Sequence, residues 1–511
     1  MASEANTVLE APVPATNSVV GELKTLIRQS SHYLVGLVGG LALGFISFPI
    51  FTRMFSVADY GLIDFAQKII VLTVAFAKGG LQNSALRFFN REKFKTDRDE
   101  ARRYYSTMFY GVAAFAAPVT GLFLAGNALL PENTIDAPLR AILAFGGILI
   151  FVRAMQSMVW SFARIEERTK AYTISNLLVK AGAIAAIFAL IPLLGTSVRT
   201  YYAGTMVAEI AILAAMSFGL FRGGLLRFGF FSRELCGAAL AFGLPMVAQE
   251  LAGIILDSGS RALIRYYLGA DPLGYYSVAY GLAGYVNTLL MAPLGLAILP
   301  IYMRLWREEG REKTIEFLSM GLNAFLLCAT GLLALAAVCS NDAVVLMASR
   351  KFSQAGPLIP TLVAGLLIYT IQVFLNAGLL IQKKTGTMAM VLGLSAVLNL
   401  GLNVILLPRM GLQGAAIAAL LSFLISTVLM AHLAFKILPM KVRWLPLAGY
   451  IGATAVVYFV VPLIHMSRPL LNLAVKAPTA LVLFGGIVYA IDPEVRRLVA
   501  MVLRRLNLVK A

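Results

Sequence analysis

The sequence is poor in charged residues, cysteine and histidine. Only 13% of its 511 residues are charged, whereas an average soluble domain has about 25%. The three cysteines (Cys236, Cys328 and Cys339) and three widely separated histidines give no basis for a disulfide framework or a metal cluster. We therefore expect neither a metal nor a cofactor. The absence of a GxxxxGK[ST] motif also argues against a nucleotide site.

Long apolar runs take the place of these groups. Hydrophobic residues make up 59% of the chain and its mean hydropathy is +0.82, which indicates an integral membrane protein. A spanning helix needs about 20 mostly apolar residues, and the sequence predicts an all-α polytopic membrane protein with about 14 transmembrane helices. The predicted spans are 33–52, 63–82, 104–126, 139–160, 171–194, 200–221, 235–257, 275–300, 315–339, 356–380, 387–408, 411–435, 444–465 and 470–490.

Lysine and arginine are distributed unequally between the two predicted membrane faces. With both termini in the cytoplasm, 29 of the 43 Lys and Arg residues fall on inner segments, nearly three times as many as on outer ones, as expected because basic loops stay inside. The net charge of +18 is therefore predicted to contact anionic membrane lipids rather than nucleic acid. Residues 1–32 lack signal-peptide features and are predicted to be a cytoplasmic tail, and 491–511 to be a basic amphipathic cytoplasmic tail.

The chain also contains an internal repeat. RMFSVADYG (53–61) resembles RYYLGADPLG (265–274), and a second set of matches has one offset of 216: Gln156, Thr169, Pro192 and Gly195 recur as Gln372, Thr385, Pro408 and Gly411. Six spans separate equivalent residues, so both copies have the same orientation, which predicts two parallel six-helix repeats. The predicted parts are an N-terminal lobe (33–221), a cytoplasmic linker (222–234), a C-terminal lobe (235–435) and two further transmembrane helices (436–490).

The second predicted span, IDFAQKIIVLTVAFAKGGLQ (63–82), carries charges that are costly in hydrocarbon. At about 100° per residue, Lys68 and Lys78 lie about 40° to either side of Asp64, and Gln82 has the direction of Asp64. We expect this polar stripe to face the bundle interior or a water-filled cavity. The alternative is that each lysine extends to its nearer membrane face.

Further charged side chains lie inside other predicted spans. Arg153 lies in the fourth span, and Lys180 lies in the fifth, too deep to reach the surface easily. Cations of this kind bind oxyanions, and a carboxyl group between burial and a nearby cation can load and release a proton. The alternative is that acids and bases only neutralise one another. The acidic residues of the sixth and seventh spans are Glu209, Glu250 and Asp257, with Arg261 one turn further.

The predicted spans of the C-terminal lobe from 275–300 to 411–435 contain one charged residue, Glu316, and their polar groups are mainly amides. Amides bind neutral hydroxyl groups, although they also bond neighbouring helices to each other in membranes. Cations in one lobe and amides in the other suggest a ligand with an anionic end and a sugar-like end. The candidate sugar contacts, one of them in the N-terminal lobe, are Gln156, Asn287, Gln372 and Asn376.

Four segments carry a family resemblance: FPIFTRMFSVADYGLIDFA, LQNSALRFFNRE, LIRYYLGADPLGYYSVAYGLA and LPRMGLQGAAIAALLSF. Together they resemble the polysaccharide, or Wzx-type, branch of the multidrug/oligosaccharidyl-lipid/polysaccharide exporter superfamily. The resemblance implies a fourteen-helix fold of two six-helix lobes and no enzyme activity. It also implies a flippase that moves undecaprenyl-diphosphate-linked oligosaccharide repeat units across the bacterial inner membrane for surface polysaccharide synthesis, by alternating access.

With this resemblance, the intramembrane charges receive roles. Diphosphate binding in a cationic central cavity is assigned to Lys68, Lys78, Arg153 and Lys180, and proton- or sodium-linked coupling to Glu209, Glu250 and Asp257. A polysaccharide polymerase and a chain-length regulator are expected partners. Three alternatives stay open: a lipid II flippase, a cation-coupled drug exporter of the same superfamily, and a membrane-embedded polymerase or ligase of lipid-linked glycans.

Overall fold

A computed structural model describes residues 36, 38–131, 137–466 and 468–505, and their regular structure is entirely helical. The first half comprises a helix Val38–Met54, α2 (Val57–Ala77), α3 (Leu81–Phe88), α4 (Arg91–Thr96), α5 (Arg98–Leu129), α6 (Ala137–Ile165), α7 (Thr169–Leu194) and α8 (Val198–Arg222). The second half comprises η1 (Phe228–Phe230), α9 (Arg233–Leu268), α10 (Ala270–Glu308), α11 (Gly310–Met347), η2 (Arg350–Leu358), α12 (Ile359–Thr370), α13 (Gln372–Ile381), α14 (Thr385–Phe435), α15 (Trp444–Val460), η3 (Val461–Leu463), α16 (Pro469–Ile491) and α17 (Pro493–Arg505).

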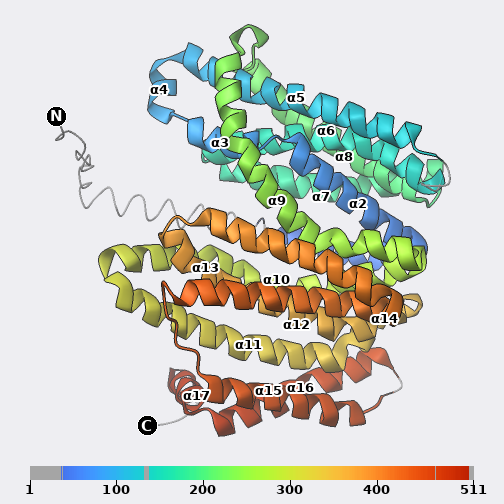
Figure 1. Cartoon of the computed structure of the whole chain (residues 1–511). Coiled ribbons are helices and arrows are strands. Elements are labelled where there is room, and N and C mark those ends of the chain that lie inside the picture. The colour runs from blue at the N-terminus through green and yellow to red at the C-terminus, as the bar shows by residue number, and fades with distance from the viewer. Residues whose placement is uncertain (1–35, 37, 132–136, 467, 506–511) are drawn as a thin grey trace, which may run out of the picture.

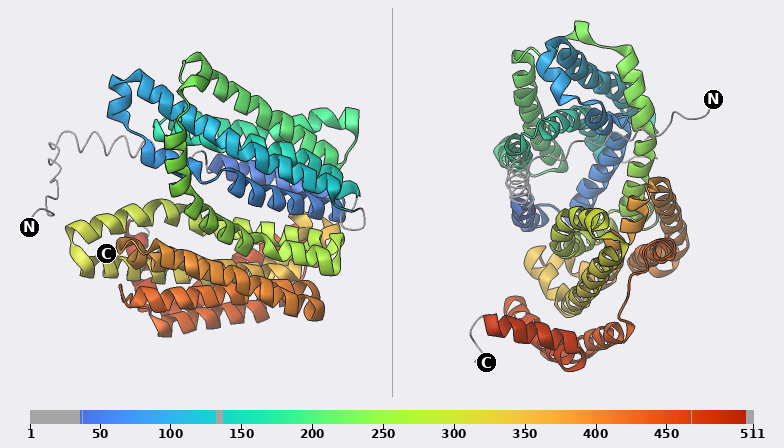
Figure 2. Two further views of the ribbon diagram at one scale, coloured as in Figure 1. Left: turned by 45° about the horizontal axis from the view of Figure 1, so that its top comes forward. Right: turned by 90° about the vertical axis from the view of Figure 1, so that its left-hand side faces the viewer.

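The helices form two bundles that lie side by side, with a smaller group beyond the second bundle (Figure 1; Figure 2, right). The first bundle contains the helix Val38–Met54 and α2 to α8, and the second contains α10 to α14. Helix α9 joins them, because its first half packs on α3 and α5 and its second half packs on α14. The smaller group, α15 to α17, packs on α11 of the second bundle.

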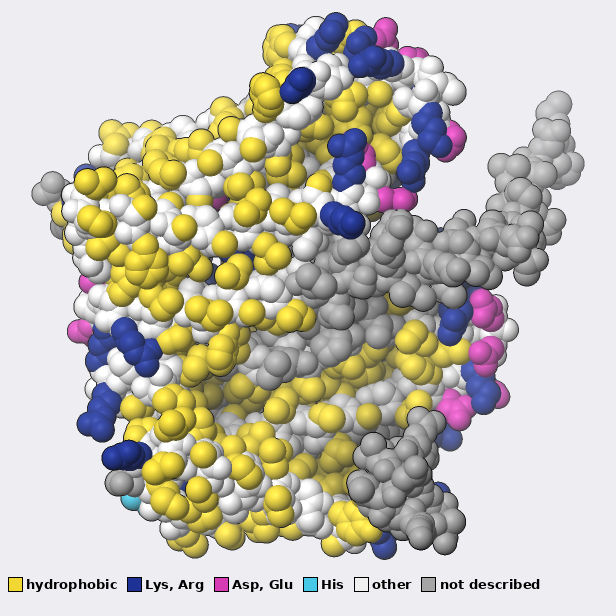
Figure 3. Space-filling view, turned by 180° about the vertical axis from the view of Figure 1, so that it is seen from behind, with side chains coloured by type: hydrophobic (Ala, Val, Ile, Leu, Met, Phe, Trp, Pro, Cys, Tyr) yellow, Lys and Arg dark blue, Asp and Glu magenta, His cyan; other side chains and the backbone are white. Residues whose placement is uncertain are grey.

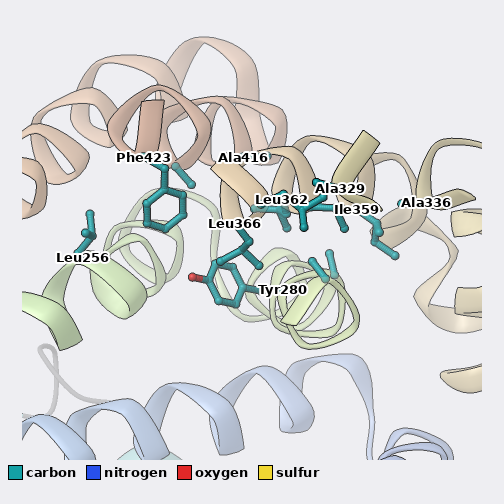
Figure 4. Close-up of a cluster of buried hydrophobic side chains, with 14 of the residues drawn as sticks. Leu256, Tyr280, Ala329, Ala336, Ile359, Leu362, Leu366, Ala416 and Phe423 are labelled. Carbon is teal, nitrogen blue, oxygen red and sulfur yellow. The ribbon is translucent and has the colours of Figure 1, made fainter. Parts of the chain in front are cut away.

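Each of these groups has its own cluster of buried apolar side chains. The first bundle is centred on Met108, Leu149 and Tyr202, which are fully buried. Figure 4 shows part of the second cluster, in which side chains of α9, α10, α11, α12 and α14 converge. A third cluster joins α11 to α15 and α16. Apolar packing therefore holds each group together, and it also connects the two bundles, because Phe48, Val57 and Tyr60 of the first bundle pack in the second cluster.

The protein is a multi-pass membrane protein. The described residues contain 11 helices that are long and apolar enough to cross a membrane. In Figure 3, hydrophobic side chains cover the middle of the exposed face, whereas Lys, Arg, Asp and Glu gather at its two ends. Charged groups at both ends of an apolar band are expected of a bundle that crosses a bilayer. The count of fourteen spans stays a prediction, and the residue bounds of the predicted lobes likewise.

The internal repeat is visible in the backbone. Gly195 ends α7 with a φ of 71°, and its sequence equivalent Gly411 interrupts α14 with a φ of 58°. Such values favour glycine because a Cβ atom is strained there. A proline precedes each glycine by three residues, so both copies break the helix by the same local chemistry. The break in α14 separates the predicted spans 387–408 and 411–435.

The predicted span 63–82 ends earlier than expected. Helix α2 begins at Val57, where Ser56 caps it by accepting a hydrogen bond from the backbone N–H of Asp59, and it ends at Ala77. Gly79 and Gly80 both have positive φ angles and stop the helix. Gln82 therefore lies in α3, and the predicted alignment of Gln82 with Asp64 on one helix is wrong. The glycine turn also permits a close approach, since a Cβ atom on Gly80 would lie 2.1 Å from the carbonyl oxygen of Gly243 in α9.

The two bundles cross closely at the opposite end of α2. A Cβ atom on Gly61 would lie 2.6 Å from the backbone nitrogen of Gly274 in α10, and one on Gly274 would lie 2.1 Å from the carbonyl oxygen of Val57. Gly61 and Gly274 are equivalent residues of the repeat, so the two copies pack on each other at this point. We call this end of the molecule the Gly61 end and the other the α4 end.

Cationic side chains add a second connection at the Gly61 end. Arg53 donates hydrogen bonds to the carbonyl oxygens of Leu346 and Met347 at the end of α11. In return, Lys351 donates to the carbonyl oxygens of Arg53 and Phe55. The last carbonyls of a helix have no partner within it and carry partial negative charge. Each bundle therefore caps a helix end of the other.

Ionic contacts attach the last helices. Asp492, fully buried between α16 and α17, accepts hydrogen bonds from Tyr450 and, at 2.7 Å, from Arg443. Burial raises the pKa of Asp492, but these hydrogen bonds outweigh it and hold the pKa below its usual range. At the Gly61 end, Asn472 and Lys476 of α16 lie 2.7 and 3.7 Å from Asp342 of α11.

The crossing of α2 and α10 can be tested with a pair of glycine substitutions. We expect Gly61→Ala to lower the free energy of unfolding by roughly 1–3 kcal/mol, because the added methyl group meets the α10 backbone. Gly121→Ala in α5 is the control, since a Cβ atom there would have no neighbour within 4 Å. Thermal unfolding of both purified variants in detergent measures the difference. Equal midpoints would show that the crossing is not tight.

Candidate functional site

Three ion pairs connect α2 to α9 across the space between the bundles. Asp64 accepts a hydrogen bond from Arg261 at 2.5 Å, Lys68 lies 3.2 Å from Asp257, and Lys78 lies 2.6 Å from Glu250. The partners follow each other in opposite order along the two helices, as expected for an antiparallel pair. We call these contacts the α2–α9 ladder.

The ladder is most highly connected at its first pair. The Arg261 side chain is only 3% exposed, donates to the carbonyl oxygen of Asp257 and lies over the Tyr280 ring, with 4.6 Å between the guanidinium carbon and the ring centroid. Tyr280 in turn donates to Asp257, and Ser277 donates to Asp64. A buried charge is stable only when it is paired and hydrogen-bonded, and these contacts provide both.

The other end of the ladder is simpler and more open. Glu250 contacts Lys78 and, at 3.4 Å, the amide nitrogen of Gln82. Its side chain is 33% exposed and lines a cavity of about 520 Å³ together with Lys78 and Gln249. Glu250 therefore combines an ion pair with access to this cavity.

Arg153 and Glu209 form an ion pair within the first bundle. The guanidinium of Arg153 in α6 reaches both carboxylate oxygens of Glu209 in α8, at distances of 2.8–3.1 Å. Glu209 is only 5% exposed. Such a bidentate pair is strong and geometrically specific. The predicted diphosphate-binding cation and the predicted coupling acid thus neutralise each other in this structure.

Lys180 lies elsewhere in the first bundle. It lines a cavity of about 240 Å³ between the helix Val38–Met54, α7 and α8, where Glu209 also contributes to the wall. This cavity shares Gly44, Ser47 and Tyr201 with a second one of about 200 Å³ that reaches Asp64. Lys180 forms no ion pair within the described residues.

A larger opening lies at the α4 end, where two cavities of about 430 and 520 Å³ share Gln82, Asn83, Arg164 and Met246. We call the combined space the α3–α9 cleft, because residues of these two helices face each other across it. Arg87 of α3 and Arg164 of α6 line it. Sequence reasoning missed both arginines, since they lie in or beside basic loops and resemble ordinary inward-facing charges.

The predicted amides have mixed environments. Gln372 is buried and donates to Ser426 and Thr427, so in this structure its amide group connects α13 to α14. Asn287 accepts a hydrogen bond from Thr370 at 2.7 Å. Gln156 is 2% exposed, and its amide nitrogen has no hydrogen-bond partner among the described residues; the same holds for the amide oxygen of Asn376. Their predicted contact with sugars stays a prediction.

The four predicted phosphate-binding cations do not share one cavity in this structure. Lys78 lines the α3–α9 cleft, Lys180 lines the first-bundle cavity, and Arg153 is held by Glu209. Lys68 contacts Asp257. Their assignment to diphosphate binding in one cationic cavity stays a prediction. Periodicity could not place them relative to one another, because it gives the helix face of a side chain but not the neighbour that this face meets.

The chain matches the model of the polysaccharide biosynthesis protein family over residues 27–306, more than half of its length. The chain belongs to this family. One similar protein is a succinoglycan biosynthesis transport protein of Rhizobium meliloti. It is 24% identical over 342 residues, which cover 66% of this chain and 65% of that protein. A probable low-salt glycan biosynthesis flippase of Haloferax volcanii is 25% identical over 199 residues, or 39% of this chain and 42% of that protein.

The chain thus spans less than two thirds of the length of these curated relatives. Solved structures share its fold at low sequence identity. The lipid II flippase MurJ in an inward closed conformation aligns with 91% of this chain and 99% of its own, with a TM-score of 0.68 and 14% identity. An inward-facing multidrug resistance MATE transporter aligns with 78% of this chain and 97% of its own, with a TM-score of 0.61 and 14% identity. This member of the polysaccharide biosynthesis protein family therefore has a fold similar to that of both transporters.

Arg153 and Lys180 are expected to respond differently to truncation. Arg153→Ala leaves the Glu209 carboxylate buried without a partner, which should lower the free energy of unfolding by about 3 kcal/mol. Lys180→Ala leaves no carboxylate unpaired and should change stability little. The double variant Arg153→Gln/Glu209→Gln removes both charges and should recover most of the stability lost by Arg153→Ala. Thermal midpoints in detergent test this, and an Arg153→Ala protein as stable as the parent would contradict it.

Proposed function

We propose that this protein is a flippase that moves undecaprenyl-diphosphate-linked oligosaccharide repeat units across the bacterial inner membrane for surface polysaccharide synthesis. The family match and the names of the two relatives support a transport role in glycan synthesis. The observation that carries the proposal is the α3–α9 cleft, which opens between α3, α6 and α9, reaches Leu392 of the second bundle and is lined by Lys78, Arg87 and Arg164. Cations in such a cleft suit a lipid diphosphate.

The structure suits a state that is accessible from the α4 end. The bundles meet closely at Gly61 and Gly274, and Arg53 and Lys351 connect them there. The cleft lies at the other end. We assign the α4 end to the cytoplasm because Lys and Arg gather on the predicted inner segments. Lipid-linked precursors would then enter the cleft from the cytoplasmic leaflet, and separation at the Gly61 end would release them outside.

The Lys78–Glu250 pair offers a way to connect substrate and ion. A diphosphate that binds Lys78 competes with Glu250 for the ammonium group, because both are anions. Glu250, released from its partner in the cleft, can bind a proton or a sodium ion. Substrate binding would thereby weaken a contact between the bundles and load the coupling ion at the same residue.

The alternatives make different demands on the cleft. A drug exporter for cationic substrates would need an excess of acid, whereas here Arg87 and Arg164 add positive charge beside the single carboxylate of Glu250. A polymerase or ligase needs groups for chemistry outside the membrane, and the predicted outer segment 258–274 instead forms the end of α9 and the start of α10. A lipid II flippase would share the diphosphate site, and the headgroup of the transported lipid separates it from our proposal.

The first test is genetic. Deletion of the gene should leave undecaprenyl-diphosphate oligosaccharide on the cytoplasmic leaflet and abolish one surface polysaccharide, because the repeat unit cannot cross hydrocarbon unaided. Extraction and sizing of lipid-linked glycans measures this. Unchanged glycans and an intact polymer would contradict the proposal. Accumulation of peptidoglycan precursors would instead support the lipid II alternative, and long polymer lacking only its final attachment would support a ligase.

The second test concerns coupling. Glu250→Gln keeps the size of the side chain and its hydrogen bonding but cannot titrate. In vesicles with an imposed proton or sodium gradient, we expect this variant to lose gradient-driven transport while it still binds lipid-linked substrate. Glu234→Gln is the control, since Glu234 lies in the same helix, is 89% exposed and contacts only Arg103 at 3.5 Å. A full gradient response in Glu250→Gln would exclude this residue.

A further inference from the structure

The α3–α9 cleft contains two arginines without a carboxylate partner among the described residues. Several basic side chains at the α4 end of the first bundle form ion pairs, such as Arg91 with Glu167 and Arg168 with Glu166, whereas others, such as Arg98, form none among the described residues. Arg87 and Arg164 line the cleft and form no ion pair within the described part of the chain. Their charge is therefore available to a ligand.

Both guanidinium groups are held in position without being neutralised. The guanidinium carbon of Arg87 lies 4.3 Å from the centroid of the Phe242 ring of α9. Arg164 donates a hydrogen bond to the hydroxyl of Ser161 at 3.0 Å and lies 5.7 Å from the Tyr172 ring centroid. Contacts with aromatic faces and neutral hydroxyls orient a guanidinium group but leave its donors for an oxyanion.

The walls of the cleft are apolar beside these cations. Leu86 and Met246 line it and are 69% and 37% exposed, and Ile165 and Phe242 complete this side. Exposed apolar groups next to unpaired cations suit a ligand that is itself amphipathic. A free phosphate would use only the arginines, whereas a phosphorylated lipid would use both surfaces.

The charge of the cleft favours a diphosphate over a phosphodiester. Lys78, Arg87 and Arg164 contribute three cations, and Glu250 balances one of them. Two positive charges then remain for the ligand. A phosphodiester lipid carries a single charge, and a lipid diphosphate carries at least two, distributed over two phosphate groups that can each meet one bidentate arginine.

We propose that Arg87 and Arg164 form a loading site that binds the diphosphate and first isoprenoid units of a polyprenyl diphosphate, before the ligand reaches Lys78. This inference rests on the proposed function for the identity of the lipid, and it adds an order of events and the contacts of the isoprenoid chain. Arg87 and Arg164 hold the diphosphate, and Leu86, Phe242 and Met246 contact the start of the chain. Arg87 lines only the cavity of about 430 Å³, the Lys78–Glu250 pair lines only the adjoining one of about 520 Å³, and Arg164 lines both, so it connects the two positions.

The test uses the full-length protein in nanodiscs of zwitterionic lipid. Native mass spectrometry measures binding of three probes: undecaprenyl diphosphate, phosphatidylglycerol and inorganic pyrophosphate. We expect the parent protein to prefer undecaprenyl diphosphate to both other probes. Arg87→Gln/Arg164→Gln should weaken its binding by on the order of tenfold or more, because two charge-assisted contacts are lost.

Arg307→Gln is the matched control. Arg307 is an exposed arginine of α10 that donates only to the backbone of its own helix, at Met303, and does not line the cleft. Its substitution should leave binding unchanged. All these side chains are exposed, so the variants should keep the thermal midpoint of the parent. Equal binding by the double variant and the parent would overturn the loading site, as would equal affinity of the parent for phosphatidylglycerol and undecaprenyl diphosphate.

Transport assays separate this inference from the proposed function. If the parent protein translocates lipid-linked oligosaccharide in proteoliposomes, and the double variant binds undecaprenyl diphosphate as well as the parent does, the flippase proposal stands and the loading site is excluded. If binding depends on the two arginines but the parent protein translocates nothing, the loading site stands and the flippase proposal is excluded.

Discussion

The α2–α9 ladder is the contact on which the relation of the two bundles depends. Within each bundle, buried apolar side chains hold the helices together, as in the cluster around Met108 and Tyr202. Between the bundles, three ion pairs and the close crossing at Gly61 add to the apolar contacts of Phe48 and Tyr60. Apolar side chains that separate inside a membrane are covered by lipid chains, whereas separated charges need water or a charged ligand as a new partner, which a cleft between the helices can provide. An interface of this kind is suited to repeated opening.

The ladder also changes in character along its length. At Asp64 and Arg261, tyrosine, serine and backbone groups complete a buried network, and separating it would leave several polar groups without partners. At Lys78 and Glu250, the pair lines a cavity and has few other contacts. The ladder thus places its most buried and most highly connected pair towards the Gly61 end and its two more exposed pairs towards the α4 end. This arrangement agrees with a structure that is closed at the first end and open to a ligand at the second.

Some of this arrangement could be predicted from the sequence, and the reason for the failures is specific. The stripes on α2 and α9 were both found by helical periodicity, and mutual neutralisation was one of the alternatives. The sequence could not show that these two stripes face each other, because periodicity gives the directions of side chains within one helix only. Arg87 and Arg164 were missed for a related reason: nothing local distinguishes an arginine whose neighbours lack carboxylates from one in an ion pair. Gln82 was misplaced because the double glycine that ends α2 was treated as part of the span.

The sequence by itself determined the class of this protein. Its apolar runs specify a multi-pass helical membrane protein, because a segment that crosses hydrocarbon must hydrogen-bond all of its own backbone N–H and C=O groups, and a helix does so. Its repeat places the same glycine at the break after α7 and within α14, because only glycine adopts that conformation without strain. Tertiary structure alone decided the pairing of Arg153 with Glu209 and of Lys78 with Glu250, and it placed Lys180 in a cavity that Glu209 also lines. Those outcomes depend on how helices distant in the chain pack, and side-chain charges respond to neighbours that no local pattern contains.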